Sequence, residues 1–185
     1  MPLMLPPVIG ALMWKVMMSA GRRGVLNHFL TLMGIETIGW IGSPTWALPS
    51  VIMIDLWLTT PFFVLIIMAG LQSLPTEPYE SAIVDGASAW QVFTHITIPL
   101  LKPFIILACT FRVIDALRTF DIIYTTTMGG PGEATLLLHI AGFFHYIRWN
   151  FIGYAMSVIV VLVVLVFVSS RFLISYWDRA VEQAY

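Results

Sequence analysis

Residues 75–103 read PTEPYESAIVDGASAWQVFTHITIPLLKP and separate two long apolar runs. Thr76 is placed to be the N-cap of a helix, and Pro78 falls in the first turn, where the missing N–H of proline costs little. Glu77 and Glu80 lie in the same turn, where the helix dipole favours negative charge. The stretch therefore predicts a short helix with an acidic first turn, set between two apolar segments.

A second short helix is expected to follow at once. Gly86 is placed to end the first helix, and Ser88 and Gln91 have the spacing of a capping box. Because the residue before a proline is biased away from helical angles, the next long apolar segment is expected to begin at Pro99. These signals together predict a helix–turn–helix at a membrane surface. The three- and four-residue spacing gives its first helix one narrow apolar face, made of Tyr79, Ala82, Ile83 and Gly86.

The composition is that of a membrane protein. Of 185 residues, 59% are hydrophobic and 10% are charged, against about 25% charged in ordinary soluble domains. The net charge of −1 lacks the basic footprint of a nucleic-acid-binding protein. Cys109 is the single cysteine, and the four histidines do not have the spacing of helical metal ligands. No glycine-rich phosphate loop is present, so we predict no metal, no cofactor and no enzymatic activity in this chain.

Four apolar runs approach the length of about 20 residues that a membrane-spanning helix needs. They cover residues 2–20, 47–71, 99–124 and 152–170. Pro6 and Pro7 interrupt the first run, Asp55 and Pro61 interrupt the second, and the last is expected to stop at Arg171. The predicted fold class is an all-α, multi-pass transmembrane helical bundle of about four spans.

Charged residues recur every three positions in the second half of the third run, at Arg112, Asp115, Arg118 and Asp121. A charge that faces lipid in the middle of a span costs about 2.5–3.5 kcal/mol, so Arg112 and Asp115 are expected to face the protein interior or a water-filled path. Two interpretations stay open for them: a structural ion pair, or a role in a solute pathway. Lys and Arg divide equally between the two sides of the membrane, so charge does not decide the orientation.

The spacing of these motifs resembles that of one protein family. Glu80-Ser81-Ala82, Gly86 four residues later, and Ile96-x-Ile98-Pro99 after nine more match the EAA loop of permease subunits in binding-protein-dependent ABC importers. Ser81 and Ile98 depart mildly from the Ala and Leu of that pattern. Further matches resemble the branch that imports sugars of the maltose or glycerol-phosphate type. They are Asp85-Gly86-Ala87, Phe120-Asp121, Gly129-Gly130-Pro131-Gly132, and Trp57 through Pro61-Phe62.

The resemblance implies that residues 1–185 form the transmembrane domain of such an importer, with a cytoplasmic coupling loop over residues 75–99. Permeases of this type usually have further spans before the point where this sequence begins, so about two N-terminal spans are expected to be absent. The implied location is the plasma (inner) membrane of a bacterium or archaeon. The implied partners are a second permease subunit, two copies of an ABC ATPase subunit, an extracytoplasmic solute-binding protein and the lipid bilayer.

The resemblance also implies two groups of functional residues. The residues expected to couple to the ATPase are Tyr79, Glu80, Ala82, Ile83, Asp85 and Gly86. Those expected to line the pathway of a sugar or sugar-like solute are Leu58, Thr59, Phe62, Asp115, Ala116 and Thr119. An alternative function is that of a non-transporting membrane scaffold or assembly protein derived from a truncated permease.

Overall fold

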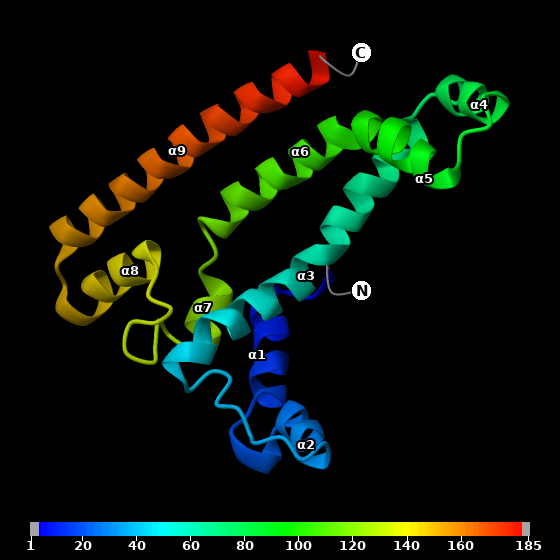
Figure 1. The fold of residues 1–185 in the computed structure, drawn as a ribbon. Coiled ribbons are helices and arrows are strands. Elements are labelled where there is room, and N and C mark those ends of the chain that lie inside the picture. Colours follow the sequence, from blue (N-terminus) through cyan, green and yellow to red (C-terminus); the bar gives the residue numbers. More distant parts are fainter. Residues whose placement is uncertain (1–3, 183–185) are drawn as a thin grey trace. The chain divides into compact units, whose positions relative to one another are not determined.

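The computed structural model describes residues 4–182, and every regular element among them is helical (Figure 1). The all-α prediction is therefore confirmed. The elements in chain order are α1 (Pro7–Met17), η2 (Gly21–Arg23), α2 (Val25–Leu32), α3 (Pro44–Ser73), α4 (Glu77–Val84), α5 (Ala89–Val92), η3 (Phe93–Thr97), α6 (Ile98–Ala116), α7 (Asp121–Thr126), α8 (Leu138–Trp149) and α9 (Ile152–Glu182).

Among residues 4–182, three continuous helical stretches are long and apolar enough to cross a membrane: Pro44–Ser73, Ala89–Ala116 and Ile152–Asp178. The first of the four expected spans is shorter than predicted, because α1 has 11 residues and so extends about 17 Å. Pro6 and Pro7 fix its start, and soon after its end Gly21 takes a positive φ of 64°. Positions 2 and 3 of that prediction lie outside the described residues.

The ends of the other spans also differ from the prediction. Helix α6 ends at Ala116, so the expected span does not run on to residue 124, and α7 is a separate helix. Helix α9 continues beyond Arg171 to Glu182. An arginine does not end a helix, because it has good helix propensity and its long side chain can reach the polar boundary of the membrane.

The prediction that a new segment begins at Pro99 is wrong. Ile98 has helical angles (φ −62°, ψ −48°), and α5 continues through η3 into α6 as one helical stretch of 28 residues. In the π-helical turn η3, the Ile98 N–H donates to the carbonyl oxygen of Phe93. This wider turn gives room to the Pro99 ring, which would otherwise press on the preceding turn of an α-helix.

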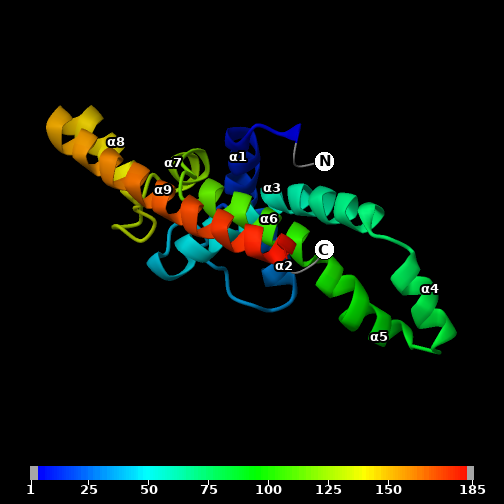
Figure 2. The same cartoon turned by 90° about the horizontal axis from the view of Figure 1, so that it is seen from above.

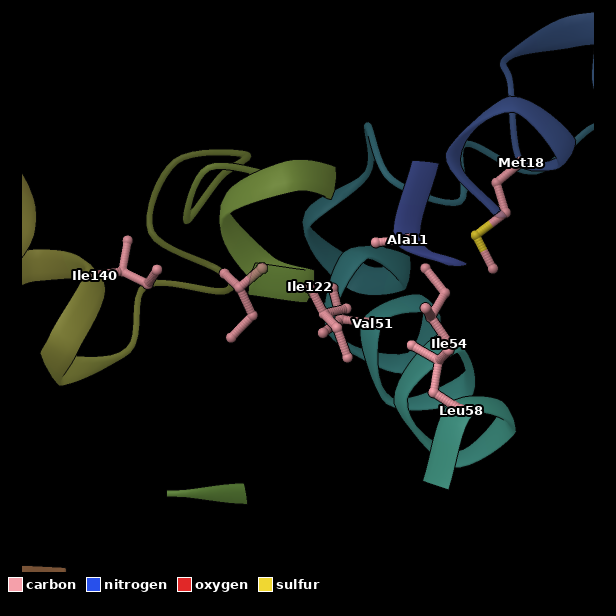
Figure 3. Packing of buried hydrophobic residues seen from close by; sticks show 8 residues of the cluster. Ala11, Met18, Val51, Ile54, Leu58, Ile122 and Ile140 are labelled. Carbon is pink, nitrogen blue, oxygen red and sulfur yellow. The ribbon is translucent and has the colours of Figure 1, made fainter. Parts of the chain in front are cut away.

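The chain forms two compact units. Unit 1 comprises Met1–Pro61 and Leu117–Leu165, and unit 2 comprises Phe62–Ala116 and Val166–Tyr185. The core of unit 1 joins α1, α3, α7 and α8, as the close view of its apolar side chains shows (Figure 3). Its buried members are Ala11, Met18, Val51, Ile54, Leu58, Ile122, Ile123 and Ile140.

Polar contacts fix the connections of unit 1. Lys15 Nζ donates to the carbonyl oxygen of Thr125 at 2.8 Å, so an α1 side chain satisfies the C-terminal end of α7. Asn27 is completely buried, and its amide makes four hydrogen bonds: to the backbone of Ser19, twice to the backbone of Ile38, and to the indole of Trp40. The turn after α2 is therefore held to the end of α1.

In unit 2, the second part of α3 runs antiparallel to α6. Phe62 stacks edge-on against Phe111 at 6.2 Å between ring centroids. A Cβ added to Gly70 would lie 2.7 Å from the Phe104 ring. As the residue number rises along α3, the number of its partner on α6 falls. The segment between α3 and α6 consequently reverses the chain at one end of unit 2, where α4 and α5 lie together in both views (Figures 1 and 2).

Candidate functional site

The segment of residues 74–97, which we call the coupling segment, contains two helices with well-defined ends. Helix α4 begins after Thr76, as predicted, but the Thr76 side chain makes no capping hydrogen bond, since the residue itself has helical angles. Its last residue is Val84 and its C-cap is Asp85, and the next residue, Gly86, has a φ of +73°. The Gly86 N–H donates to Ile83 O and the Ala87 N–H donates to Ala82 O. This pair of bonds is a Schellman motif, and it confirms the predicted role of Gly86 as a stop.

The predicted capping box of α5 is confirmed. The Gln91 N–H donates to Ser88 Oγ, and the Ser88 N–H donates to Gln91 Oε1 at 2.8 Å. The turn between α4 and α5 thus has its backbone hydrogen bonds satisfied on both sides, which makes it a defined turn rather than a loose loop.

Replacement of Ser88 by alanine is expected to lower the local stability of α5 by about 1 kcal/mol, because the N-terminal amides lose their side-chain acceptor. Hydrogen–deuterium exchange of the amides of Ala89–Val92 measures the effect. Ser81→Ala is the matched control: the Ser81 hydroxyl donates to the Glu77 carbonyl within α4 and is exposed, so its loss should change exchange little. Equal effects of the two substitutions would contradict the role of the capping box.

The coupling segment has an inner face that holds α4 against η3. Tyr79 Oη lies 3.2 Å from Thr97 Oγ1 and donates a hydrogen bond to it. Ala82 is 7% exposed. These two residues are used in packing the segment itself.

The outer face of α4 is exposed and partly apolar. Ile83 is 75% exposed and Val84 is 88% exposed, and Glu80 on the same face is exposed as well. The predicted single apolar face is therefore wrong, because Tyr79 and Ala82 point inward and Ile83 points outward. Val84 was not among the predicted residues, although its position four after Glu80 places it on the same face.

A cleft opens on the other side of Gly86, between the end of α4 and the start of the next helix. Its volume is about 320 Å³, and it is lined by Asp85, Gly86, Ala87, Gln91, Val92, His95 and Ile96. The sequence interpretation included Asp85 and Gly86 but missed Gln91 and His95, which line the cleft only because the turn brings α5 beside the end of α4. The only charged residues of the coupling segment are three carboxylates, at Glu77, Glu80 and Asp85.

The six predicted pathway residues are divided between the units: Leu58, Thr59 and Thr119 belong to unit 1, and Phe62, Asp115 and Ala116 belong to unit 2. In unit 1, Leu58 is buried in the core and touches Gly10, whose added Cβ would lie 2.7 Å from Leu58 Cδ2. Thr59 Oγ1 donates to the Asp55 carbonyl at 2.8 Å. The Thr119 carbonyl accepts a 2.8 Å hydrogen bond from His139 Nε2. Burial lowers the pKa of His139 below its ordinary value, with the Thr119 bond opposing this, so the ring that donates is neutral near pH 7.

In unit 2, Phe62 is half-buried and contacts Phe63 and Phe111, while Asp115 and Ala116 are exposed at the end of α6. Arg112 Nη1 lies 3.3 Å from Asp115 Oδ2. This contact confirms that the two charges pair along one helix face. The pathway role of Asp115 stays a prediction. In the part of the chain that the structure describes, no three His, Cys, Asp or Glu side chains gather as a metal site.

Comparison with known proteins identifies the family to which this chain belongs. The family model described as binding-protein-dependent transport system inner membrane component matches residues 1–183. The chain belongs to this family. Among curated members of this permease family, it is 42% identical to the trehalose/maltose transport system permease protein MalF of Thermococcus litoralis, over 90% of this chain and 56% of that protein. It is 45% identical to the sulfoquinovosyl glycerol transport system permease protein SmoG of Agrobacterium fabrum, over 75% of this chain and 45% of that protein.

The chain thus spans about half the length of the curated permeases that it matches. Its fold is that of a solved bacterial ABC transporter involved in the import of the acidic polysaccharide alginate, with a TM-score of 0.85 and 24% identity over 96% of this chain and 62% of the other. A structure of the alginate transporter in complex with a pentasaccharide-bound periplasmic protein matches with a TM-score of 0.83 and 24% identity, over 94% of this chain and 60% of that one.

Proposed function

We propose that this chain is a transmembrane permease subunit of an ABC importer that moves a sugar or sugar-like solute across the plasma membrane. Family membership and the three candidate spans support a multi-pass membrane protein. The names of the two similar permeases, for trehalose/maltose and sulfoquinovosyl glycerol, favour a carbohydrate solute. ATP hydrolysis is assigned to a partner subunit, as is general for this family.

The observation that carries the proposal is the exposed outer face of α4. Ile83 and Val84 project from a helix whose C-terminal end and inner face are already held by the chain's own contacts. A short rigid helix that shows apolar side chains beside a carboxylate is suited to a groove on a soluble partner. We assign that partner as the ATPase subunit, with Glu80 at the rim and Ile83 and Val84 in the centre.

The same construction explains how movement of the ATPase would reach the membrane. Tyr79 links α4 to Thr97 of η3. From Ala89 onward the chain is helical without interruption to Ala116, inside a candidate span. A displacement of α4 is therefore passed to α6 through a hydrogen bond and a continuous helix, with no slack loop between them.

For the solute pathway we propose Thr59, Phe62, Asp115, Ala116 and Thr119 as lining residues. An aromatic ring suits the apolar face of a sugar, and hydroxyl and carboxylate groups suit its hydroxyl rim. Leu58 is assigned a positioning role, since it is buried against Gly10 and holds α1 to α3.

The assembly that we propose has a second permease subunit, two ATPase copies and an extracytoplasmic solute-binding protein. The solute-binding protein would deliver solute near Gly129–Gly132, and the pathway would open alternately to each side. The complex of the alginate transporter with its periplasmic protein supports this type of delivery.

Substitution of Gly86 in the reconstituted complex tests the proposal. Space around Gly86 is open, with no atom within 4 Å of an added Cβ, so only its left-handed φ restricts substitution. Gly86→Asn should keep most solute-stimulated ATP hydrolysis, because asparagine tolerates this conformation. Gly86→Val should lower it about tenfold or more, because a β-branched residue is strained there by roughly 1–2 kcal/mol or more.

Solute-stimulated ATP hydrolysis and solute uptake in proteoliposomes are the measurements. An ATPase that binds the complex but is never stimulated by solute would favour the scaffold function over transport. A Gly86→Val complex with normal coupling would contradict transmission through α4.

A further inference from the structure

Helix α2 has one face that packs on its own unit and an opposite face that does not. The inner face carries Asn27, which is completely buried, and Leu26, which packs on the core of unit 1. The other face is exposed and apolar. Its members follow the helical spacing i, i+4, i+7 and i+8, and they are between 46% and 75% exposed: Val25, Phe29, Leu32 and Met33. We call these four residues the α2 apolar face, and they make α2 an amphipathic helix whose apolar side is turned away from its own unit.

Contacts with the start of α3 set the level of α2 relative to the membrane. The Trp40 indole donates to Asn27 Oδ1 at 3.1 Å, and its ring packs edge-on against Trp46, with 5.8 Å between ring centroids. Trp46 lies in the first turn of α3, which is a candidate span. Because tryptophan is enriched where the hydrocarbon of a membrane meets the headgroups, this pair indicates the level of that boundary. Asn27 therefore holds α2 at the same level, beyond the end of α1 (Figure 1).

Two arginines precede the α2 apolar face. Arg22 and Arg23 belong to η2, and both are exposed. In the part of the chain that the structure describes, neither guanidinium has an ion-pair or hydrogen-bond partner. Glu36 is the only acidic residue in the sequence before Asp55, and among the described residues it forms no ion pair with them. A guanidinium group binds phosphate through parallel hydrogen bonds, so the segment presents phosphate donors beside apolar side chains.

We propose that residues 21–33 bind the bilayer surface, with the α2 apolar face among the acyl chains and Arg22 and Arg23 on the phosphates of anionic phospholipids. An amphipathic helix at this level lies in the plane of the interface, and basic residues strengthen its binding to anionic lipid. Lipid is favoured over a soluble partner because the apolar side chains lie where hydrocarbon is already present to cover them. The inference goes beyond the proposed function, since it needs a chain in a membrane but neither solute nor ATPase.

A spin label on the α2 apolar face tests the apolar contact. The label is attached through Met33→Cys in a Cys109→Ser background, and the importer complex is reconstituted in vesicles of phosphatidylcholine and phosphatidylglycerol. Oxygen dissolves in hydrocarbon and a nickel chelate stays in water, so relaxation of the label by each reagent reports its surroundings. We expect the label at position 33 to meet oxygen and to be protected from the chelate. Glu133→Cys is the control, because Glu133 is exposed in unit 1 outside the candidate spans, and its label should meet the chelate.

Brominated lipids test the contact with phosphate. A fluorophore is attached through His28→Cys in the same background, since His28 is exposed beside the α2 apolar face. The fractions of brominated phosphatidylglycerol and of brominated phosphatidylcholine that give half-maximal quenching are compared, and their ratio measures the lipid preference. Arg22→Gln and Arg23→Gln should each lower the preference for phosphatidylglycerol about fivefold. Glu36→Gln is the matched control, because it removes a charge of opposite sign from the same segment, and it should keep or raise the preference.

The outcomes separate this inference from the proposed function. A label at position 33 that meets the chelate as the label at position 133 does would overturn the inference. A label that the solute-binding protein protects from both reagents would overturn it too, since that protein would then cover the α2 apolar face. Equal quenching by the two lipids before any arginine is changed would overturn the assignment of Arg22 and Arg23 to phosphate. Loss of solute-stimulated ATP hydrolysis is a different readout: its absence from the unmodified complex would overturn the proposed function and leave the lipid contact intact.

Discussion

Replacing Ile83 and Val84 together with aspartate is expected to weaken binding of the ATPase subunit by more than about 100-fold, because burial of each side chain contributes about 1.5–3 kcal/mol. The two residues have 75% and 88% of their surface exposed in the chain, so they contribute little to its own fold. The free energy lost would therefore be that of the interface. The new carboxylates add to the loss, since a groove complementary to apolar side chains does not solvate them.

Co-purification and binding titration of the ATPase with the reconstituted permease measure this effect. Ile35→Asp is a suitable control, because Ile35 is 49% exposed and lies outside the coupling segment and the candidate spans. The single variants should each lose about tenfold. Normal ATPase binding by the double variant would show that α4 does not enter a groove on that subunit.

The local structure of the coupling segment could be predicted because its signals lie within a few residues of one another. Ser88 and Gln91 form the capping box, and Gly86 has the positive φ that ends α4. The face that α4 exposes could not be predicted in the same way. Which of Ala82 and Ile83 points inward depends on the bond from Tyr79 to Thr97, 18 residues away.

The spans show the same division between local and distant causes. Apolar runs located all three long helices, because hydrophobic length is a local property of the sequence. The end of α6 is different, since the residues after Ala116 continue the charge pattern without a proline or glycine until Gly129. In the structure, His139 binds the Thr119 carbonyl in the break between α6 and α7. That contact joins residues 20 positions apart.

The solute-pathway residues depend most on distant contacts. Leu58 and Thr59 lie on α3, whereas Asp115 and Ala116 are at the end of α6, and spacing along the sequence cannot say which of these side chains reach one solute. Resemblance to a family supplied those positions, and the structure adds their local partners: Gly10 for Leu58, and Arg112 for Asp115.

No pattern in the sequence singles out Asn27. Its substitution is nevertheless expected to have the largest effect on the stability of unit 1. Its amide is fully buried and bonds to Ser19, Ile38 and Trp40 at 2.9–3.1 Å. Asn27→Ala leaves these groups without partners, and each unsatisfied buried group costs about 1–3 kcal/mol. We expect a total loss of roughly 3 kcal/mol or more, because several such groups are affected at once.

Thermal unfolding in detergent and exchange of the Ile38 amide measure the loss, with exposed His28→Ala as the neighbouring control. Asn27→Asp separates hydrogen bonding from volume. It keeps the acceptor for the Ile38 N–H and the Trp40 indole, but it loses both donors and faces the Ser19 and Ile38 carbonyls with a carboxylate. Both variants should therefore unfold early and expose the Ile38 amide. If Ile38 stays protected in Asn27→Ala, packing of Trp40 and the bond from Ser50 to its carbonyl hold the turn without Asn27.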